Sequence, residues 1–139
     1  GQFLDLSYEK RKINNLKITN MQKKKTGKLF KFCCLAPAII AEESNKVKNE
    51  MSFIGEEIGF LFQITDDLLD IKGNKKNIGK SVNKDKKKGK STLINLLGYN
   101  KTLEFAFRRK KIVINRLKKH GKKSNELIET LNFILERTY

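Results

Sequence analysis

Apolar residues recur along most of this chain at the three- and four-residue spacing of α-helices. Residues 26–41 show this spacing, and we expect a helix there for which Thr26 serves as the N-terminal cap. A longer helix is predicted from about Ser44 to Ile71, because its apolar positions again follow one stripe. The stripes consist of Leu29, Phe30, Phe32, Cys33, Ala36 and Ile40 in the first helix, and of Val47, Met51, Ile54, Ile58, Leu61, Phe62, Thr65 and Leu69 in the second.

Residues 72–92 interrupt the helical pattern. Gly73, Gly79 and Gly89 stand there among a dense set of lysines, and this composition predicts a loop. The helical spacing returns at Ser91 or Thr92 and continues through residues 100–119.

The C-terminal part of the chain also predicts helix. Gly121 ends one periodic segment, and Ser124 offers a cap for a last helix that carries Leu127 and Leu131 on its apolar face. No segment shows the alternation of a β-strand, and no linker divides the chain. We therefore expect an all-α fold in which residues 1–139 belong to a single domain.

The net charge of +16 over 139 residues calls for an explanation. A basic helical protein of this size could bind nucleic acid, because covering phosphates releases counterions. Arginine, which base-reading surfaces favour, occurs only at positions 11, 108, 109, 116 and 137, so a general bias towards lysine is the better explanation. Part of the charge could also serve a small, densely anionic ligand.

Hydropathy and cysteine content bear on location. The mean hydropathy is −0.55, and no apolar run is long enough to span a bilayer, so we expect a cytoplasmic protein without membrane insertion. Cys33 and Cys34 are adjacent, which disfavours a disulfide, and we expect both to be buried apolar side chains.

Three carboxylates share one face of the helix predicted for residues 44–71. With Asp66 as the origin and about 100° per residue, Asp70 lies about 40° round the helix and Asp67 about 100°. Gln63 falls within the same arc one turn earlier, and Gly55 and Gly59 extend the stripe towards the helix start. Glycine at two such positions makes sense if a ligand or another helix must approach the backbone closely.

The carboxylate face predicts a metal site. Carboxylates this close repel each other unless a cation lies between them. Oxygen ligands without His or Cys favour Mg²⁺, which commonly shares itself with phosphate oxygens. The lysine-rich segment that follows could then neutralise a polyphosphate. A P-loop is excluded, because Gly73 and Gly79 have five residues between them instead of four and no strand precedes them.

The sequence from Phe62 to Asp70, F-Q-I-T-D-D-L-L-D, resembles the second aspartate-rich motif of the trans-type polyprenyl diphosphate synthases, such as the farnesyl and geranylgeranyl enzymes. The resemblance extends to other motifs in the family's order. They are Gln2 with Asp5 and Leu6 (G-Q-x-x-D-L), Lys25-Thr26-Gly27 (K-T-G), and Gly79-Lys80, Asp85 and Gly89-Lys90-Ser91-Thr92 (G-K…D…G-K-x-T). The segment from Leu131 to Arg137 resembles the closing helix and basic tail.

The resemblance implies the fold, the reaction and the site. The fold would be the C-terminal portion of the isoprenoid synthase helical bundle. The reaction would join an allylic diphosphate to isopentenyl diphosphate. The implied roles are Mg²⁺ binding by Asp66, Asp67 and Asp70, diphosphate binding by Lys25, Lys80 and Lys90, and catalytic contacts by Lys25, Thr26, Gln63 and Lys80.

The resemblance also implies what would lie outside these residues. The family's first aspartate-rich motif would precede Gly1, so we expect this chain alone to be catalytically silent and the full-length enzyme to be an active homodimer. Asn83 departs from the family's usual glycine in the lysine-rich segment. Two alternatives are a small basic nucleic-acid-binding protein and a non-catalytic subunit of a heteromeric synthase; the intact D-D-x-x-D and lysine motifs argue against the second.

Overall fold

The computed structural model describes residues 1–8, 14–77 and 92–137. Every regular element in these ranges is helical, so the predicted all-α fold is confirmed. In chain order the elements are α1 (Gln2–Ser7), α2 (Asn15–Gln22), the π-helix η1 (Lys23–Gly27), α3 (Lys28–Ile40), α4 (Asn45–Asn77), α5 (Leu93–Leu97), α6 (Tyr99–Leu117), the 3₁₀ segment η3 (Lys118–Ser124) and α7 (Asn125–Glu136).

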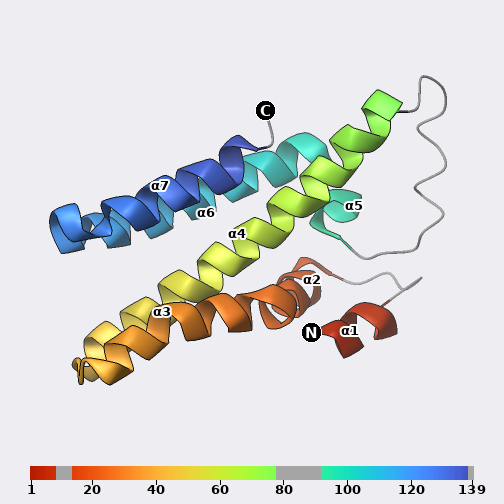
Figure 1. Cartoon of the computed structure of the whole chain (residues 1–139). Coiled ribbons are helices and arrows are strands. Elements are labelled where there is room, and N and C mark those ends of the chain that lie inside the picture. The colour runs from red at the N-terminus through yellow and green to blue at the C-terminus, as the bar shows by residue number, and fades with distance from the viewer. Residues whose placement is uncertain (9–13, 78–91, 138–139) are drawn as a thin grey trace.

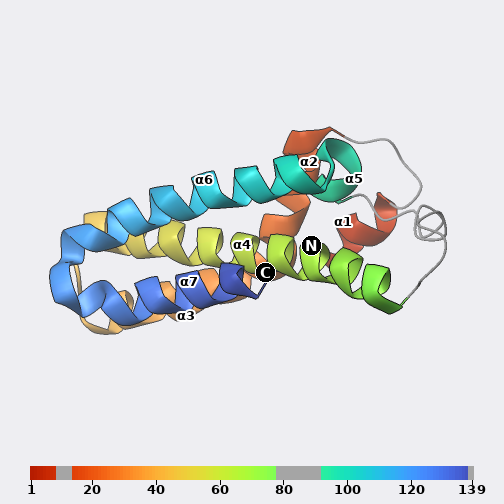
Figure 2. The same ribbon diagram turned by 90° about the horizontal axis from the view of Figure 1, so that it is seen from above.

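The long helix α4 is the axis of the fold (Figure 1). Helix α3 packs along its first half, and α6 and α7 cover the other side. Seen from above, α6 and α7 run along α4 as an antiparallel pair joined by η3 (Figure 2). Among the described helices, none combines the length and the apolar character needed to cross a lipid bilayer.

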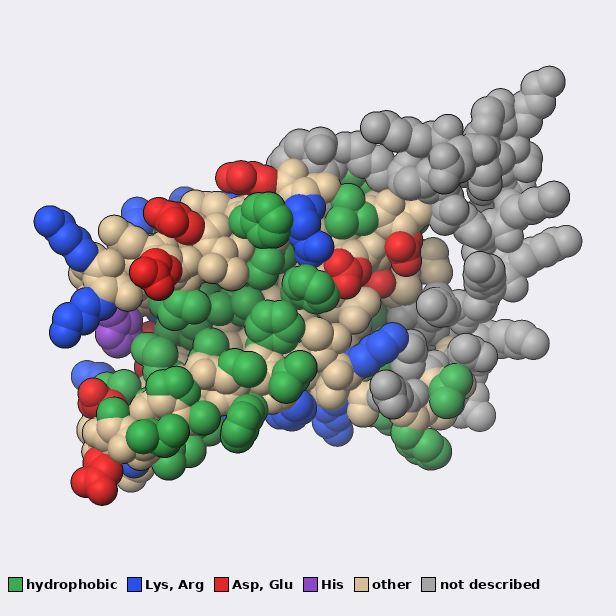
Figure 3. All heavy atoms as spheres, viewed as in Figure 1, with side chains coloured by type: hydrophobic (Ala, Val, Ile, Leu, Met, Phe, Trp, Pro, Cys, Tyr) green, Lys and Arg blue, Asp and Glu red, His purple; other side chains and the backbone are tan. Residues whose placement is uncertain are grey.

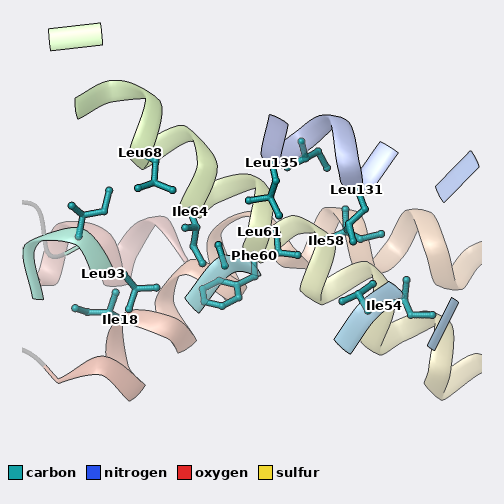
Figure 4. Packing of buried hydrophobic residues seen from close by; sticks show 14 of the residues in the cluster. Ile18, Ile54, Ile58, Phe60, Leu61, Ile64, Leu68, Leu93, Leu131 and Leu135 are labelled. Carbon is teal, nitrogen blue, oxygen red and sulfur yellow. The ribbon is translucent and has the colours of Figure 1, made fainter. Parts of the chain in front are cut away.

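The core follows the apolar stripe of α4. Ile54, Leu61 and Leu68 are completely buried, each two turns from the next. They meet Leu131 and Leu135 of α7 towards one end, and Ile18 of α2 and Leu93 of α5 towards the other (Figure 4). The predicted stripe of the long helix is confirmed in part. Ile54, Ile58, Leu61 and Thr65 are buried, and the buried face also includes residues outside the prediction, namely Phe60, Ile64 and Leu68.

Several predicted boundaries were wrong. Thr26 does not cap a helix, because it lies inside η1, where α2 and α3 form one continuous helical path. Residues 72–77, predicted as loop, continue α4, while residues 78–91 lie outside the described residues. Gly98 separates α5 from α6 with a φ of 81°, a conformation that glycine adopts readily and other residues rarely do.

The cap predicted at Ser124 does not form, whereas α5 has a cap that was not predicted. The side chain of Thr92 accepts the backbone N–H of Asn95. Ser124 precedes α7, but its hydroxyl donates to the carbonyl of Gly121 instead of accepting from the helix.

The apolar stripe predicted for α3 divides into two faces. Phe30 packs against α4, and its ring centroid lies 5.6 Å from that of Phe62. Leu29, Phe32 and Ile40 are 66%, 67% and 82% exposed, and hydrophobic side chains gather over this part of the surface (Figure 3). Cys33 is exposed with them, so its predicted burial was wrong.

Glycines bring the backbones of α3 and α4 together. A Cβ atom at Gly55 would lie 2.5 Å from the carbonyl oxygen of Phe30 and 2.8 Å from Cα of Lys31. A Cβ atom at Gly59 would lie 2.8 Å from Cα of Gly27. Of the two partners considered for these glycines, a ligand or another helix, the structure shows the helix.

We predict that Gly55→Ala lowers the free energy of unfolding by about 1–3 kcal/mol, because the new methyl group meets backbone atoms that must move. This loss would occur although Ala favours an isolated helix over Gly by about 1 kcal/mol. Urea unfolding followed by circular dichroism measures it, with Asn49→Ala on the exposed face of α4 as the control. Equal or greater stability of Gly55→Ala would show that the helices are not in such close contact.

Candidate functional site

The aspartates of the D-D-x-x-D motif lie on α4 at the border between core and solvent. Leu68 is fully buried, whereas Asp66 and Asp67 are half-buried and Asp70 is exposed. The predicted division of this helix into an apolar face and a carboxylate face is therefore present. Acidic side chains are visible along this part of α4 in Figure 3.

A chain of hydrogen bonds connects η1 to the carboxylates. The hydroxyl of Thr26 donates to Oε1 of Gln63 at 3.0 Å. The amide Nε2 of Gln63 then donates to Oδ1 of Asp67 at 3.1 Å. Thr26 of the K-T-G motif thus forms one polar network with Gln63 and Asp67 of the aspartate-rich motif.

Gln22, which the sequence analysis did not consider, belongs to the same network. This last residue of α2 is 2% exposed, and its Nε2 donates to Oδ2 of Asp67 at 2.8 Å. Its position in the sequence could have indicated this role. Gln22 stands one turn before Thr26 and follows the apolar residues Ile18 and Met21 on the same short helix.

A buried ion cluster anchors η1. Glu57 of α4 is 1% exposed and pairs with Lys23 of η1 and with Arg109 of α6. The Arg109 guanidinium binds both carboxylate oxygens, at 2.8 Å and 2.6 Å. Because the cluster connects three elements, it fixes the π-helical turn on which Lys25 and Thr26 stand. No pattern in the sequence predicted this cluster.

Arg137 closes the other side of the carboxylate face. It follows α7 directly, and its Nη2 lies 3.4 Å from Oδ1 of Asp66. The guanidinium also lies over the ring of Phe62, 4.9 Å from the centroid. The basic tail noted in the sequence therefore contacts the D-D-x-x-D motif. The spacing of the motifs could not predict this contact.

Burial and neighbouring charges shift the pKa values of the carboxylates. Loss of hydration raises the pKa of Asp67 to about 6, against hydrogen bonding by Gln63 and the positive charge of Lys25, which lower it. The pKa of Asp66 is raised for the same first reason, while Arg137 lowers it and Asp70 raises it. Two carboxyls with raised pKa values, side by side on one helix face, are typical of a functional site.

The donor set suits a hard cation that brings further ligands with it. Among the described residues, no three carboxylate, imidazole or thiol groups converge closely enough to enclose a metal ion. Asp66, Asp67 and Asp70 offer only oxygen atoms, which is the chemistry that Mg²⁺ prefers, and Mg²⁺ commonly completes its shell with water and phosphate oxygens. The residues therefore fit one wall of a magnesium site, and the role of the three aspartates stays a prediction.

The other predicted site residues fall into two groups. Lys25 is exposed on η1 and acts electrostatically on Asp67, so it belongs to the same end of the molecule. Lys80 and Lys90, with Asn83 and Asp85, lie outside the described residues, and their predicted roles stay predictions. The G-Q-x-x-D-L segment lies in helix α1, and the start of this helix abuts the backbone of Lys25.

We predict that Asp67 makes the stability of the metal-free chain pH-dependent. Its pKa is about 6 in the folded state and about 4 when unfolded, so the folded state keeps a proton that the unfolded state releases. The contribution of Asp67 to the free energy of unfolding is therefore greatest below about pH 4. It falls, by at most roughly 3 kcal/mol, as the pH rises through about 6. Urea unfolding at pH 4.5 and 7.5 should show a smaller decrease in the free energy of unfolding for Asp67→Asn than for the wild type. The same pH dependence in both proteins would contradict the raised pKa.

Comparison with known proteins agrees with the geometry. The family model for polyprenyl synthetase matches residues 1–134. Farnesyl diphosphate synthase of Micrococcus luteus is 35% identical over 98 residues, which is 70% of this chain and 34% of that protein. The crystal structure of geranyltranstransferase from Thermotoga maritima superimposes with a TM-score of 0.77 and 29% identity, covering 98% of this chain and 46% of that one. Geranyltransferase of Helicobacter pylori, solved in complex with magnesium and isoprenyl diphosphate, gives a TM-score of 0.74 and 26% identity, covering 98% and 45%.

These relatives set the extent of the likeness. This chain spans between a third and a half of the length of the relatives just named, while they match most or all of it. The nucleic-acid alternative finds no support among them. The helical fold, the motif on α4 and the family match lead to one conclusion: the chain belongs to the polyprenyl synthetase family.

Proposed function

We propose that this chain acts as the C-terminal half of a polyprenyl diphosphate synthase, in which it holds the diphosphate of an allylic substrate for prenyl transfer. The hydrogen-bonded network that joins Thr26 and Gln63 to Asp67 carries the proposal. It connects the K-T-G segment with the D-D-x-x-D motif across 41 residues of sequence, as a shared site requires. The family match and the activities for which the relatives are named support the same activity.

The proposed reaction is the elongation of a prenyl chain. The C1–O bond of the allylic diphosphate breaks, and inorganic diphosphate leaves with the bonding electrons. The double bond of isopentenyl diphosphate then attacks the allylic cation, and a proton lost from the adjacent carbon forms the new double bond. Diphosphate departure is the step that needs charge stabilisation, since the leaving group gains negative charge as the bond breaks.

The residues of this chain would divide that work. Asp66, Asp67 and Asp70 would hold Mg²⁺, which when bound would neutralise the phosphate oxygens. Lys25 lies on η1 and would add a cationic contact to the diphosphate. Lys80 and Lys90 would add such contacts from the lysine-rich segment. Structures of relatives support the metal and the ligand, since one contains magnesium with isoprenyl diphosphate.

Thr26 and Gln63 would face the developing allylic cation. Both side chains carry oxygen atoms, and their mutual hydrogen bond holds those oxygens in place before any substrate binds. An oxygen dipole that is already oriented stabilises a cation more than a dipole that must first reorient. A homodimer and a cytoplasmic location of the full-length enzyme stay predictions.

We predict that the chain binds inorganic diphosphate only together with Mg²⁺, and that Asp66→Asn weakens this binding at least tenfold, because the lost charge is one that the cation needs. Isothermal titration with and without Mg²⁺ measures the effect. Glu104→Gln, which removes an exposed carboxylate from α6, is the matched control and should bind like the wild type.

Two results would count against the proposed function. One is diphosphate binding that needs no metal and is unchanged in Asp66→Asn. The other is metal-independent binding of duplex DNA with a steep dependence on salt, which would restore the nucleic-acid alternative.

A further inference from the structure

The amide of Gln22 is a deeply buried polar group beside the D-D-x-x-D motif. Gln22 is 2% exposed, and its side chain reaches from α2 to α4, elements separated by more than twenty residues of sequence. Its Nε2 donates to Oδ2 of Asp67 at 2.8 Å. None of the motifs that identified the site includes this residue.

Two amides hold the two oxygens of Asp67. Gln63 donates to Oδ1 and Gln22 to Oδ2, so the plane of the carboxylate is fixed from both sides. Each carboxylate oxygen has a second lone pair, which stays available to a cation or to water bound to it. Asp67 is therefore a carboxylate held in one orientation rather than a freely rotating one.

The carbonyl oxygen of the Gln22 amide gives no reason for a polar residue at this position. Its Oε1 is buried and has no hydrogen-bond partner among the described residues. A buried carbonyl without a partner is unfavourable, and an apolar side chain at this position would avoid that loss. The hydrogen bond to Asp67 is thus the only polar contact in the described structure that accounts for a glutamine here.

We infer that Gln22 is a positioning residue, which orients the Asp67 carboxylate for the cation that the D-D-x-x-D motif holds. The inference rests on the proposed function and adds to it a residue from outside the motifs. Outer partners of metal-binding carboxylates act in this way, and losing one commonly weakens metal binding about 10- to 100-fold.

Gln22→Met tests the inference, because methionine keeps the length of the side chain and removes the donor. Gln22→Asn is the second variant, which keeps an amide but makes it one methylene too short to reach. Met21→Ala, a change at a buried neighbour on the same helix, is the control for a loss of packing alone. The measured quantities are the affinity for Mg²⁺ with inorganic diphosphate and the ¹³Cγ resonance of Asp67 in the metal-free chain, assigned by its absence in Asp67→Asn.

We expect both Gln22 variants to bind Mg²⁺ and diphosphate about tenfold more weakly and to shift the Asp67 resonance. Met21→Ala should change stability but neither of these quantities. Wild-type affinity and an unmoved resonance in Gln22→Met would overturn the inference. If the wild type binds no Mg²⁺ with diphosphate, the proposed function fails, and the Asp67 resonance alone decides whether Gln22 orients the carboxylate.

Discussion

Helices α3 and α4 lie so close because Gly55 and Gly59 place no side chain between them. The contact sets the depth at which η1 meets α4, and with it the distance from Thr26 to Gln63. A bulkier residue at either glycine would separate the helices and break the hydrogen-bonded path to Asp67. The polar network of the site therefore depends on a packing contact formed by glycines one turn apart.

Ion pairs also hold η1 against α4. Glu57 is buried among cations from η1 and α6, and removing one partner of such a cluster leaves an uncompensated buried charge. The carboxylate face differs, because Asp66 and Asp67 lose hydration there and Arg137 makes a direct ion pair with Asp66. This excess of partly buried negative charge is what a cation would relieve. A chain with a net charge of +16 thus keeps a local acidic site.

The sequence predicted those features that helical periodicity controls. The apolar stripe of α4 and the shared face of the three aspartates both follow from about 100° per residue, and both are present. The extent of α4 was underestimated, since residues 72–77 carry glycine and lysine yet continue the helix. Local composition predicts loops poorly where a long helix is already propagating.

Contacts between distant elements could not be predicted in the same way. Gln22, Glu57 and Arg137 each meet their partners across 34 or more residues, so no local pattern identifies the pairs. The exposed apolar side chains of α3 have a different origin. Their spacing correctly indicated an apolar face, but the described residues contain nothing that covers it. The family relatives named above are more than twice as long as this chain.

The central claim is that η1 and the carboxylate face of α4 form a single site for a cation and a diphosphate. Paramagnetic broadening by Mn²⁺ with inorganic diphosphate tests it most directly, because Mn²⁺ prefers the same oxygen ligands as Mg²⁺. The account predicts that substoichiometric Mn²⁺ first broadens the amide resonances of residues 63–70 and of residues 25–27 together. Broadening that spares both segments and instead affects exposed acids such as Glu126 and Glu129 of α7 would contradict it.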